Sequence, residues 1–263
     1  MLTALSGEGI HEQRARLLFT SHNGMKYTGD RPVFSQPLVV LACTNRCGSN
    51  LMADYLRQTG IFAGLNEFLN ADTMANQVGK NGCTSLPDYI SHLVFKVTPK
   101  QDRLFGVKAS WDQLAMLLRA RIPSMFPGIR VVHVWRQDLV GQAVSLLIAS
   151  QTNKWTSLQQ ATTDQEPHFD SHRIDKIMQS IRSGNDQLAM IASALSLCTA
   201  SVCYEDLLED PLAALQRVAR RFDLDLGDWV PGRPAIAKQA DALNEQFVRR
   251  FRAEVERTLF NRA

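Results

Sequence analysis

Residues 38–60 read LVVLACTNRCGSNLMADYLRQTG, and this stretch decides which fold the chain adopts. Its first six residues, Leu38 to Cys43, are apolar and rich in branched side chains, as is typical of a strand buried on both faces. Its last part carries apolar residues at helical spacing up to Gly60, where a helix would end. The stretch therefore predicts a strand, a tight loop and a helix, which together form the building unit of an α/β domain.

The loop at residues 44–50, TNRCGSN, has the composition of an anion-binding loop. A helix that begins right after a strand aims several backbone N–H groups at one point, and its dipole favours negative charge there. Gly48 lets the backbone approach a ligand, and Arg46 adds a fixed positive charge. Ser49 and Asn50 offer hydrogen-bonding side chains, while the lysine of a Walker A loop is missing. We predict a phosphate- or sulfate-binding loop; an ordinary turn with a solvated Arg46 is the alternative.

Three further stretches are predicted to be short buried strands, namely Leu104–Ala109, Arg130–Trp135 and Ala200–Tyr204. Segments with apolar residues at helical spacing separate them, and no internal repeat interrupts the alternation. We therefore expect a single α/β domain over residues 1–263, with a mostly parallel central sheet flanked by helices and right-handed crossovers.

Three segments lie outside this alternation. Residues 1–36 are predicted to be an N-terminal lead-in with one short helix. Residues 71–103 form an insertion in the pattern, and the sequence leaves open whether it is a substrate lid or a long connection. Residues 240–260 carry apolar side chains at intervals of four, which predicts a C-terminal helical arm docked on the core or on a second subunit.

The composition limits the classes of partner. The 263 residues have a formal net charge of +3 with 45% hydrophobic and 21% charged residues, which is ordinary for a globular protein and too weakly basic to predict binding to nucleic acid or a membrane surface. Because there is no apolar run of about 18 residues and no secretory signal, we expect no membrane span and a cytoplasmic location. The five cysteines include no C-x-x-C pair and the six histidines are scattered, so we predict neither a disulfide framework nor a metal site.

Polar residues stand where the predicted strands end. Lys108 is at the carboxyl end of the second strand, and Arg136 directly follows the third. Ligands of open α/β sheets gather beyond such strand ends, and Ser145, on the helix after Arg136, can converge with it on a second phosphate. Glu67 follows the first strand–helix unit, and Trp155 lies in a polar loop. Plainer explanations are a solvated carboxylate for Glu67, a tolerated mid-helix serine for Ser145 and a core-capping ring for Trp155.

Several stretches, in this order, resemble one family: TNRCGSN, GLNEFL, FGVKASWDQL, WRQDLVGQAVSLLIASQTNKW, CYEDLLEDP and KQADALNEQFVRRFRAE. They look like the bacterial carbohydrate sulfotransferases typified by trehalose 2-sulfotransferase, which use 3′-phosphoadenosine-5′-phosphosulfate (PAPS). The resemblance runs from about Leu38 to the C-terminus and is broken mainly at residues 71–103. It implies a P-loop-like sulfotransferase fold, a homodimer, and transfer of a sulfuryl group from PAPS to a hydroxyl of a carbohydrate or glycolipid. The product would be 3′-phosphoadenosine-5′-phosphate (PAP), and no metal is needed.

The resemblance also implies roles for the candidate residues. The loop that holds the 5′-phosphosulfate falls on Arg46, Cys47, Gly48, Ser49 and Asn50. The 3′-phosphate contacts fall on Arg136 and Ser145, and Trp155 is a candidate for stacking on the sugar. Glu67 falls on the family's proposed general base, which accepts the proton of the sugar hydroxyl in an in-line displacement. Arg46 and Lys108 would meet the charge that grows on the departing phosphate.

Three residues depart from the family pattern. The loop has Cys47 where a serine is usual and Asn50 where a second hydroxyl is usual, and Gln137 occupies the place of a customary arginine. These departures motivate an alternative function, a catalytically degenerate relative that binds a nucleotide or a sugar without turnover. Retention of Glu67 favours catalysis. A nucleotide-dependent kinase is a further alternative, and the missing Walker lysine counts against it.

Overall fold

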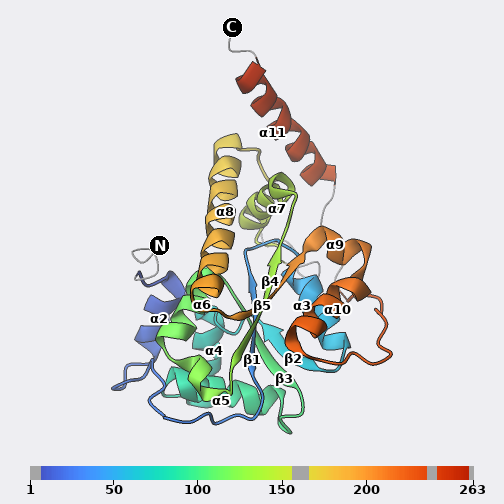
Figure 1. The fold of residues 1–263 in the computed structure, drawn as a ribbon. Coiled ribbons are helices and arrows are strands. Elements are labelled where there is room, and N and C mark those ends of the chain that lie inside the picture. The colour runs from blue at the N-terminus through green and yellow to red at the C-terminus, as the bar shows by residue number, and fades with distance from the viewer. Residues whose placement is uncertain (1–6, 156–165, 236–241, 261–263) are drawn as a thin grey trace.

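A computed structural model describes residues 7–155, 166–235 and 242–260. In these residues a five-stranded sheet with the order β2-β3-β1-β4-β5 is flanked by helices, and every pair of neighbouring strands is parallel (Figure 1). The strands are β1 (Leu38–Cys43), β2 (Phe62–Asn66), β3 (Leu104–Ala109), β4 (Ile129–Trp135) and β5 (Cys198–Cys203). The predicted α/β architecture with a parallel sheet is confirmed. Residues 240–241 of the predicted arm lie outside the described residues.

Strand β2, which directly precedes Glu67, is not among the strands that the sequence predicts. Gly64 and Leu65 both have positive φ angles, 78° and 57°, and the pairing with β3 shifts register between Gly64 and Asn66. A strand with such an irregularity loses the side-chain alternation by which strands are recognised in a sequence.

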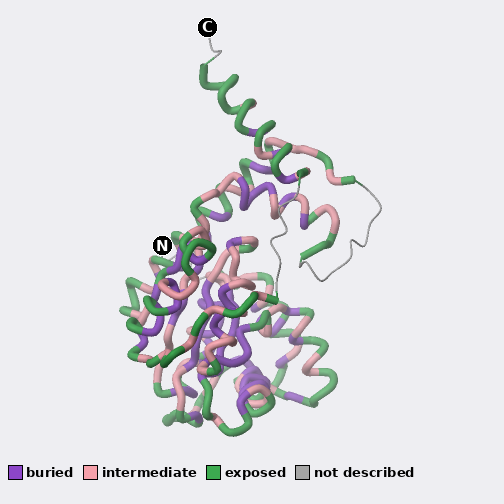
Figure 2. Tube along the Cα trace, turned by 90° about the vertical axis from the view of Figure 1, so that its right-hand side faces the viewer, coloured by how far each residue is buried: buried purple, intermediate pink, exposed green. Residues whose placement is uncertain are grey.

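Alternate side chains of β1 face two different layers of helices. Leu38, Val40 and Ala42 belong to a core that also includes residues of α2 (Ile10–Leu18), α4 (Ala71–Asn81), α5 (Leu86–Val97), α6 (Trp111–Arg119) and α8 (Ser171–Ala194). Val39 and Leu41 pack with α3 (Ser49–Gln58), α9 (Tyr204–Glu209) and α10 (Pro211–Phe222). Because both faces are covered, the strand carries a continuous apolar run. Figure 2 shows the buried residues concentrated in this body.

Residues 71–103, expected to be an insertion or lid, contribute helices α4 and α5 to the connection between β2 and β3. Met74, Leu86 and Tyr89 are completely buried in the core cluster on one face of the sheet. The Tyr89 hydroxyl donates a hydrogen bond of 2.8 Å to the Phe68 carbonyl. These contacts make both helices part of the packed body, and the short 3-10 helix η1 (Ile122–Met125) adds Ile122 to the same cluster.

A third apolar cluster lies beyond the carboxyl ends of the strands. It joins α7 (Leu139–Thr152), the first half of α8, and α11 (Ala242–Phe260), which is the helix within the predicted C-terminal arm. Phe247 and Phe251 are the buried aromatic residues of α11 in this cluster. The last turns of α11 extend away from the body (Figure 1), and Leu259 and Phe260 there are exposed.

The strand order places a crevice at the carboxyl end of β1. The chain leaves β1 for β2 and β3 on one side and then crosses to β4 and β5 on the other side. Ligands of parallel sheets bind where the connections diverge in this way. None of the helices in the described parts of the chain combines the length and the apolar character that a bilayer crossing requires.

Candidate active site

A cavity of about 1560 Å³ opens at this crevice. Its walls come from the loop after β1, the carboxyl ends of β3 and β4, and helices α7, α9 and α11. Nearly all the residues predicted for the site line it, namely Arg46, Gly48, Ser49, Asn50, Glu67, Lys108, Arg136, Ser145 and Trp155. The tertiary structure therefore brings together residues that are spread over more than a hundred positions of the sequence.

Cys47 is the predicted site residue whose side chain does not line the cavity. It is completely buried and belongs to the core cluster of β1, α3 and α10. A contact between Cys47 and a bound donor, which the family resemblance implies, would therefore involve its backbone rather than its thiol. The thiol fits this position because a free cysteine behaves as a small apolar residue.

The loop after β1 has the backbone conformation that an anion site needs. Gly48 precedes helix α3 with a φ of 89°, and a Cβ atom on it would lie 2.1 Å from the Tyr204 ring. Glycine is therefore required both for the left-handed turn and for the close approach of Tyr204. Gly48 has no side chain to cap α3, and the start of a helix left uncapped in this way is suited to binding an anion.

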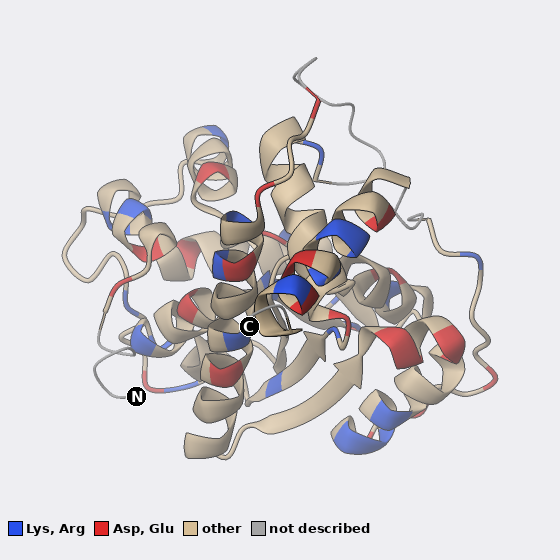
Figure 3. Ribbon diagram, turned by 90° about the horizontal axis from the view of Figure 1, so that it is seen from above, with Lys and Arg blue, Asp and Glu red and all other residues tan. Residues whose placement is uncertain are grey.

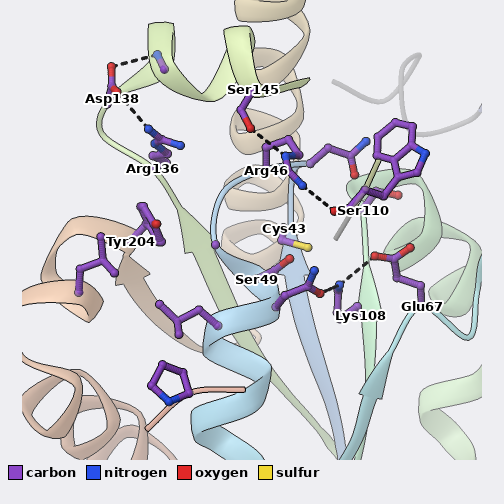
Figure 4. Close-up of a pocket in the computed structure, with 18 of the residues that line it drawn as sticks. Cys43, Arg46, Ser49, Glu67, Lys108, Ser110, Arg136, Asp138, Ser145 and Tyr204 are labelled. Carbon is purple, nitrogen blue, oxygen red and sulfur yellow. Dashed lines mark hydrogen bonds and ion pairs between the residues drawn. The ribbon is translucent and has the colours of Figure 1, made fainter. Parts of the chain in front are cut away.

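Lys108 holds Glu67 at one side of the loop (Figure 4). The Lys108 ammonium donates to Glu67 Oε1 over 2.8 Å and also to Asn50 Oδ1. The Lys108 side chain is 7% exposed, whereas that of Glu67 is 64% exposed. Lys108 thus presents a largely desolvated positive charge, and Glu67 remains open to a molecule in the cavity.

Arg46 is tied to helix α7 and to Trp155. Its Nε donates to Ser145 Oγ over 2.9 Å, and its Nη1 donates to the Trp155 carbonyl over 2.6 Å. Burial, and then the nearby Arg136 charge, lower the pKa of the Arg46 guanidinium. The sequence predicts that Ser145 acts together with Arg136; in the structure the Ser145 hydroxyl is hydrogen-bonded to Arg46.

Arg136 lies on the other side of the loop, beside Asp138 (Figure 4), and is also close to Glu205. Its Nη2 donates to Asp138 Oδ2 over 3.1 Å, and its Nε lies 3.7 Å from Glu205 Oε1. The guanidinium stands over the Tyr204 ring, 5.3 Å from its centroid. The buried Nε atom has no hydrogen-bond partner. Because Arg136 lines the cavity, its guanidinium is a candidate partner for an anion that enters there.

Asp138, Tyr204 and Glu205 were missed as members of the site, although the sequence offered a signal. Asp138 falls in the stretch WRQDLV, and the other two fall in CYEDL, both of which carry the family resemblance. Burial alone would raise the pKa of Glu205, but hydrogen bonds from the backbone N–H groups of Gln137 and Asp138 and from the Cys203 thiol hold it below its ordinary value.

Cys43 lines the cavity, where the sequence analysis described only a small residue of a core strand. A hydrogen bond from the Cys47 thiol lowers the pKa of Cys43 to about 7 against the opposing effect of burial, and the Lys108 charge and Ser49 add to the lowering. The pKa of Cys47 is raised, because the hydrogen bond to Cys43 and burial both favour its protonated thiol.

Two terminal segments complete the cavity wall, and the sequence analysis assigned neither of them to the site. The N-terminal lead-in contributes His11, whose Nδ1 accepts a 3.1 Å hydrogen bond from the Ala71 N–H. Helix α11 contributes Glu245, Arg249 and Arg252 among others. Figure 3 shows basic and acidic residues interspersed over the molecule as seen from above. Within the described ranges, no group of three or more His, Cys, Asp or Glu side chains is placed to hold a metal ion.

Comparisons with known proteins point to one class of enzyme. The family model of the Stf0 sulphotransferase matches residues 38–254. The trehalose 2-sulfotransferase of Mycobacterium tuberculosis is 26% identical over 262 residues, covering 84% of this chain and 96% of that protein. Among solved structures, the sulfotransferase domain of the Synechococcus PCC 7002 olefin synthase matches with a TM-score of 0.53 and 14% identity, covering 86% of this chain and 98% of that domain. The likeness to this domain shows the fold.

Proposed function

This chain belongs to the Stf0 sulphotransferase family, and we propose that it transfers a sulfuryl group from PAPS to a hydroxyl of a carbohydrate or glycolipid acceptor. The observation that carries the proposal is the placement of an exposed carboxylate, Glu67, on a buried lysine, Lys108, beside an anion-binding loop. The name of the mycobacterial relative supports a sugar as acceptor.

The residues of the cavity fit the charges of PAPS. We assign the 5′-phosphosulfate to the N–H groups at the start of α3, with Ser49 and Arg46 beside them. We assign the 3′-phosphate to Arg136, which lines the cavity, although Gln137 replaces the customary second arginine. Asn50 accepts a hydrogen bond from Lys108, so the residue in place of the usual hydroxyl helps to hold the lysine.

The proposed reaction is an in-line displacement at sulfur. Glu67 accepts the proton of the acceptor hydroxyl while its oxygen forms a bond to sulfur. The bond between sulfur and the 5′-phosphate oxygen breaks, and negative charge grows on that oxygen. Lys108, Arg46 and the loop N–H groups stabilise this charge, as cationic groups do in phosphoryl transfer. PAP leaves as the product, and these groups supply the stabilisation that a metal would otherwise give.

We further propose that the enzyme acts as a cytoplasmic homodimer, as the family resemblance implies. Exposed apolar residues at the end of α11, Leu259 and Phe260, support a second subunit as the partner. Sedimentation of the purified chain tests this proposal. A dimer that dissociates in the Leu259→Glu variant is the expected result, and a monomer at all concentrations contradicts it.

Calorimetric titration with PAP and with AMP tests the proposed function. We expect the wild type to bind PAP more tightly than AMP, which lacks the 3′-phosphate. Arg136→Ala should weaken the affinity for PAP by about 10-fold or more and leave the affinity for AMP little changed, because a hydrogen bond to a charged group is lost. Arg46→Ala should weaken the binding of both ligands. Arg217→Ala is the matched control, since this arginine pairs with Asp206 at 3.1 Å and lies outside the cavity lining.

Screening of sugar acceptors with PAPS then separates an enzyme from a degenerate binder. Sulfation of trehalose or a related sugar supports the proposal. PAP binding without turnover on any acceptor favours the degenerate alternative, and absence of PAP binding by folded protein refutes a PAPS-dependent reaction.

A further inference from the structure

A glutamine lies behind the anion-binding loop and contacts it directly. Gln142, in the first turns of α7, is completely buried. Its Nε2 group donates to the Asn45 carbonyl over 2.7 Å and to Thr44 Oγ1 over 3.0 Å. Both acceptors lie in the segment that connects β1 to the turn of the loop.

The Thr44 hydroxyl also forms a hydrogen bond with helix α8, so it bridges Gln142 and that helix. It accepts from Gln142 and donates to Asn185 Oδ1 over 3.3 Å. A Cβ atom on Gly184, the residue before Asn185, would lie 2.9 Å from the Thr44 methyl group, so α8 approaches the loop closely. The start of the loop is therefore fastened to two helices that pack against each other.

The amide of Gln142 has a feature that packing alone does not explain. Its Oε1 atom is buried without a hydrogen-bond partner. An unsatisfied buried carbonyl destabilises the folded state, and an apolar residue of similar length, such as methionine, would avoid this cost. What the amide provides in return is the pair of hydrogen bonds from Nε2 to the loop.

The bond to the Asn45 carbonyl acts on Arg46. Because the peptide group is planar and trans, fixing this carbonyl also fixes the direction of the Arg46 N–H. Arg46 has a φ of 64°, a left-handed conformation that a non-glycine residue keeps only when its surroundings hold it. One turn further along α7, Ser145 accepts from Arg46 Nε over 2.9 Å. Helix α7 thus holds both the peptide and the side chain of Arg46.

We propose that Gln142 is a positioning residue that holds the loop in its anion-binding conformation through Thr44 and the Asn45 carbonyl. The inference rests on the proposed function in one respect, because it takes PAP as the ligand that reads out the loop conformation. Gln142 does not itself line the cavity, so its effect on a ligand passes through the loop.

Two variants and two measurements test this role. Gln142→Met keeps the length of the side chain and removes both donors, and Thr44→Val removes one acceptor. Gln187→Met is the matched control, because Gln187 is another helical glutamine with a buried, unpartnered Oε1 and lies outside the cavity lining. Calorimetry gives the affinity for PAP, and hydrogen exchange followed by mass spectrometry gives the opening of residues 44–50.

We expect Gln142→Met to weaken the affinity for PAP by about 10-fold and to speed hydrogen exchange in residues 44–50, since two hydrogen bonds to the loop are lost. Thr44→Val should have a smaller effect, and the double variant should be less than additive because the two residues share one bond. Gln187→Met should change neither measurement by more than about 2-fold.

The inference is overturned if Gln142→Met binds PAP and exchanges its loop like the wild type. A global loss of stability that speeds exchange equally in all segments also overturns it. If the wild type does not bind PAP, the proposed function fails on its own, and the exchange of residues 44–50 in Gln142→Met still decides whether this glutamine holds the loop.

Discussion

The Lys108 ammonium and the Glu67 carboxylate lie 2.8 Å apart although they belong to different strand ends. Glu67 directly follows β2 and Lys108 lies near the end of β3, and these two strands are parallel neighbours in the sheet. Because Lys108 is buried and Glu67 is mostly exposed, the lysine holds the carboxylate without shielding it from the cavity. A carboxylate and a positive charge thus lie side by side in the wall of the cavity.

Glu67→Gln tests the role of the carboxylate. The amide cannot accept the hydroxyl proton, so we expect kcat for sulfuryl transfer to fall by about 10²-fold to 10⁴-fold. PAP affinity should stay close to that of the wild type, because Glu67 is assigned to the acceptor. Transfer of radiolabelled sulfate from PAPS gives the rate, and calorimetry gives the affinity.

Glu245→Gln provides the control for that measurement. Glu245 also lines the cavity, but it stands on α11 with its side chain 71% exposed. Its variant should retain nearly full activity. Equal losses in the two variants would show that the rate depends on the charge of the cavity rather than on a base at Glu67.

Gly48→Ala should damage both stability and donor binding. A Cβ atom there meets the Tyr204 ring in a backbone conformation with a φ of 89°. We expect the free energy of unfolding to fall by about 1–3 kcal/mol and PAP binding to weaken strongly. Gly79→Ala is the counterpart, because an added Cβ on this exposed glycine of α4 meets nothing within 4 Å. It should stabilise the protein by about 0.5–1 kcal/mol, as measured by chemical denaturation.

The reactivity of Cys43 should report its environment. With a pKa lowered to about 7, mainly by the hydrogen bond from Cys47 and further by the Lys108 charge, alkylation by iodoacetamide should reach half its maximal rate near that pH. Lys108→Met removes a nearby positive charge and should move the midpoint upward. PAP should protect Cys43, which lines the cavity.

Cys83 serves as the internal comparison in the alkylation experiment, because burial raises the pKa of its thiol. Mass spectrometry of the alkylated peptides resolves the two cysteines in one sample. A midpoint for Cys43 at the ordinary thiol value of 9.0 contradicts the assignment.

Glu205→Gln should change stability in a pH-dependent way. The pKa of Glu205 is held below its ordinary value of 4.5, because hydrogen bonds to its carboxylate outweigh burial. The charged form therefore stabilises the folded state at neutral pH. This contribution is complete above the unfolded pKa and is lost as the pH falls through the lower folded pKa. Denaturation of the wild type and the variant should therefore differ at pH 7 and converge in acid.

The exposed Glu209 on the same helix gives the control for that series. Glu209→Gln should stay within about 0.5 kcal/mol of the wild type throughout. A gap between the wild type and Glu205→Gln that widens in acid would reverse the expected sign and remove the hydrogen-bonded carboxylate as its cause.

The loop after β1 and the strands β1 and β3 were predictable because their signals are local. The bounds of β1 and β3 agree with the prediction, since each is a short apolar run that is buried on both faces. Strand β2 was not predicted because two residues with positive φ break the alternation of its side chains. Cys47 was predicted for the site because it belongs to the loop motif. The direction in which a loop side chain points depends on what packs against it, and the Cys47 side chain packs in the core.

The sequence by itself determined the alternation of strands and helices, the loop between β1 and α3, and the chemical types that surround this loop. These follow from residue spacing and from contacts within a few positions of the chain. Only the tertiary structure decided which of these residues meet. In the folded chain Lys108 pairs with Glu67, and Arg46 donates a hydrogen bond to Ser145. Arg136 lies between Asp138 and Glu205. The physical reason is that such pairings depend on the strand order and on the packing of helices over the sheet edge, and these are properties of the whole core rather than of any one segment.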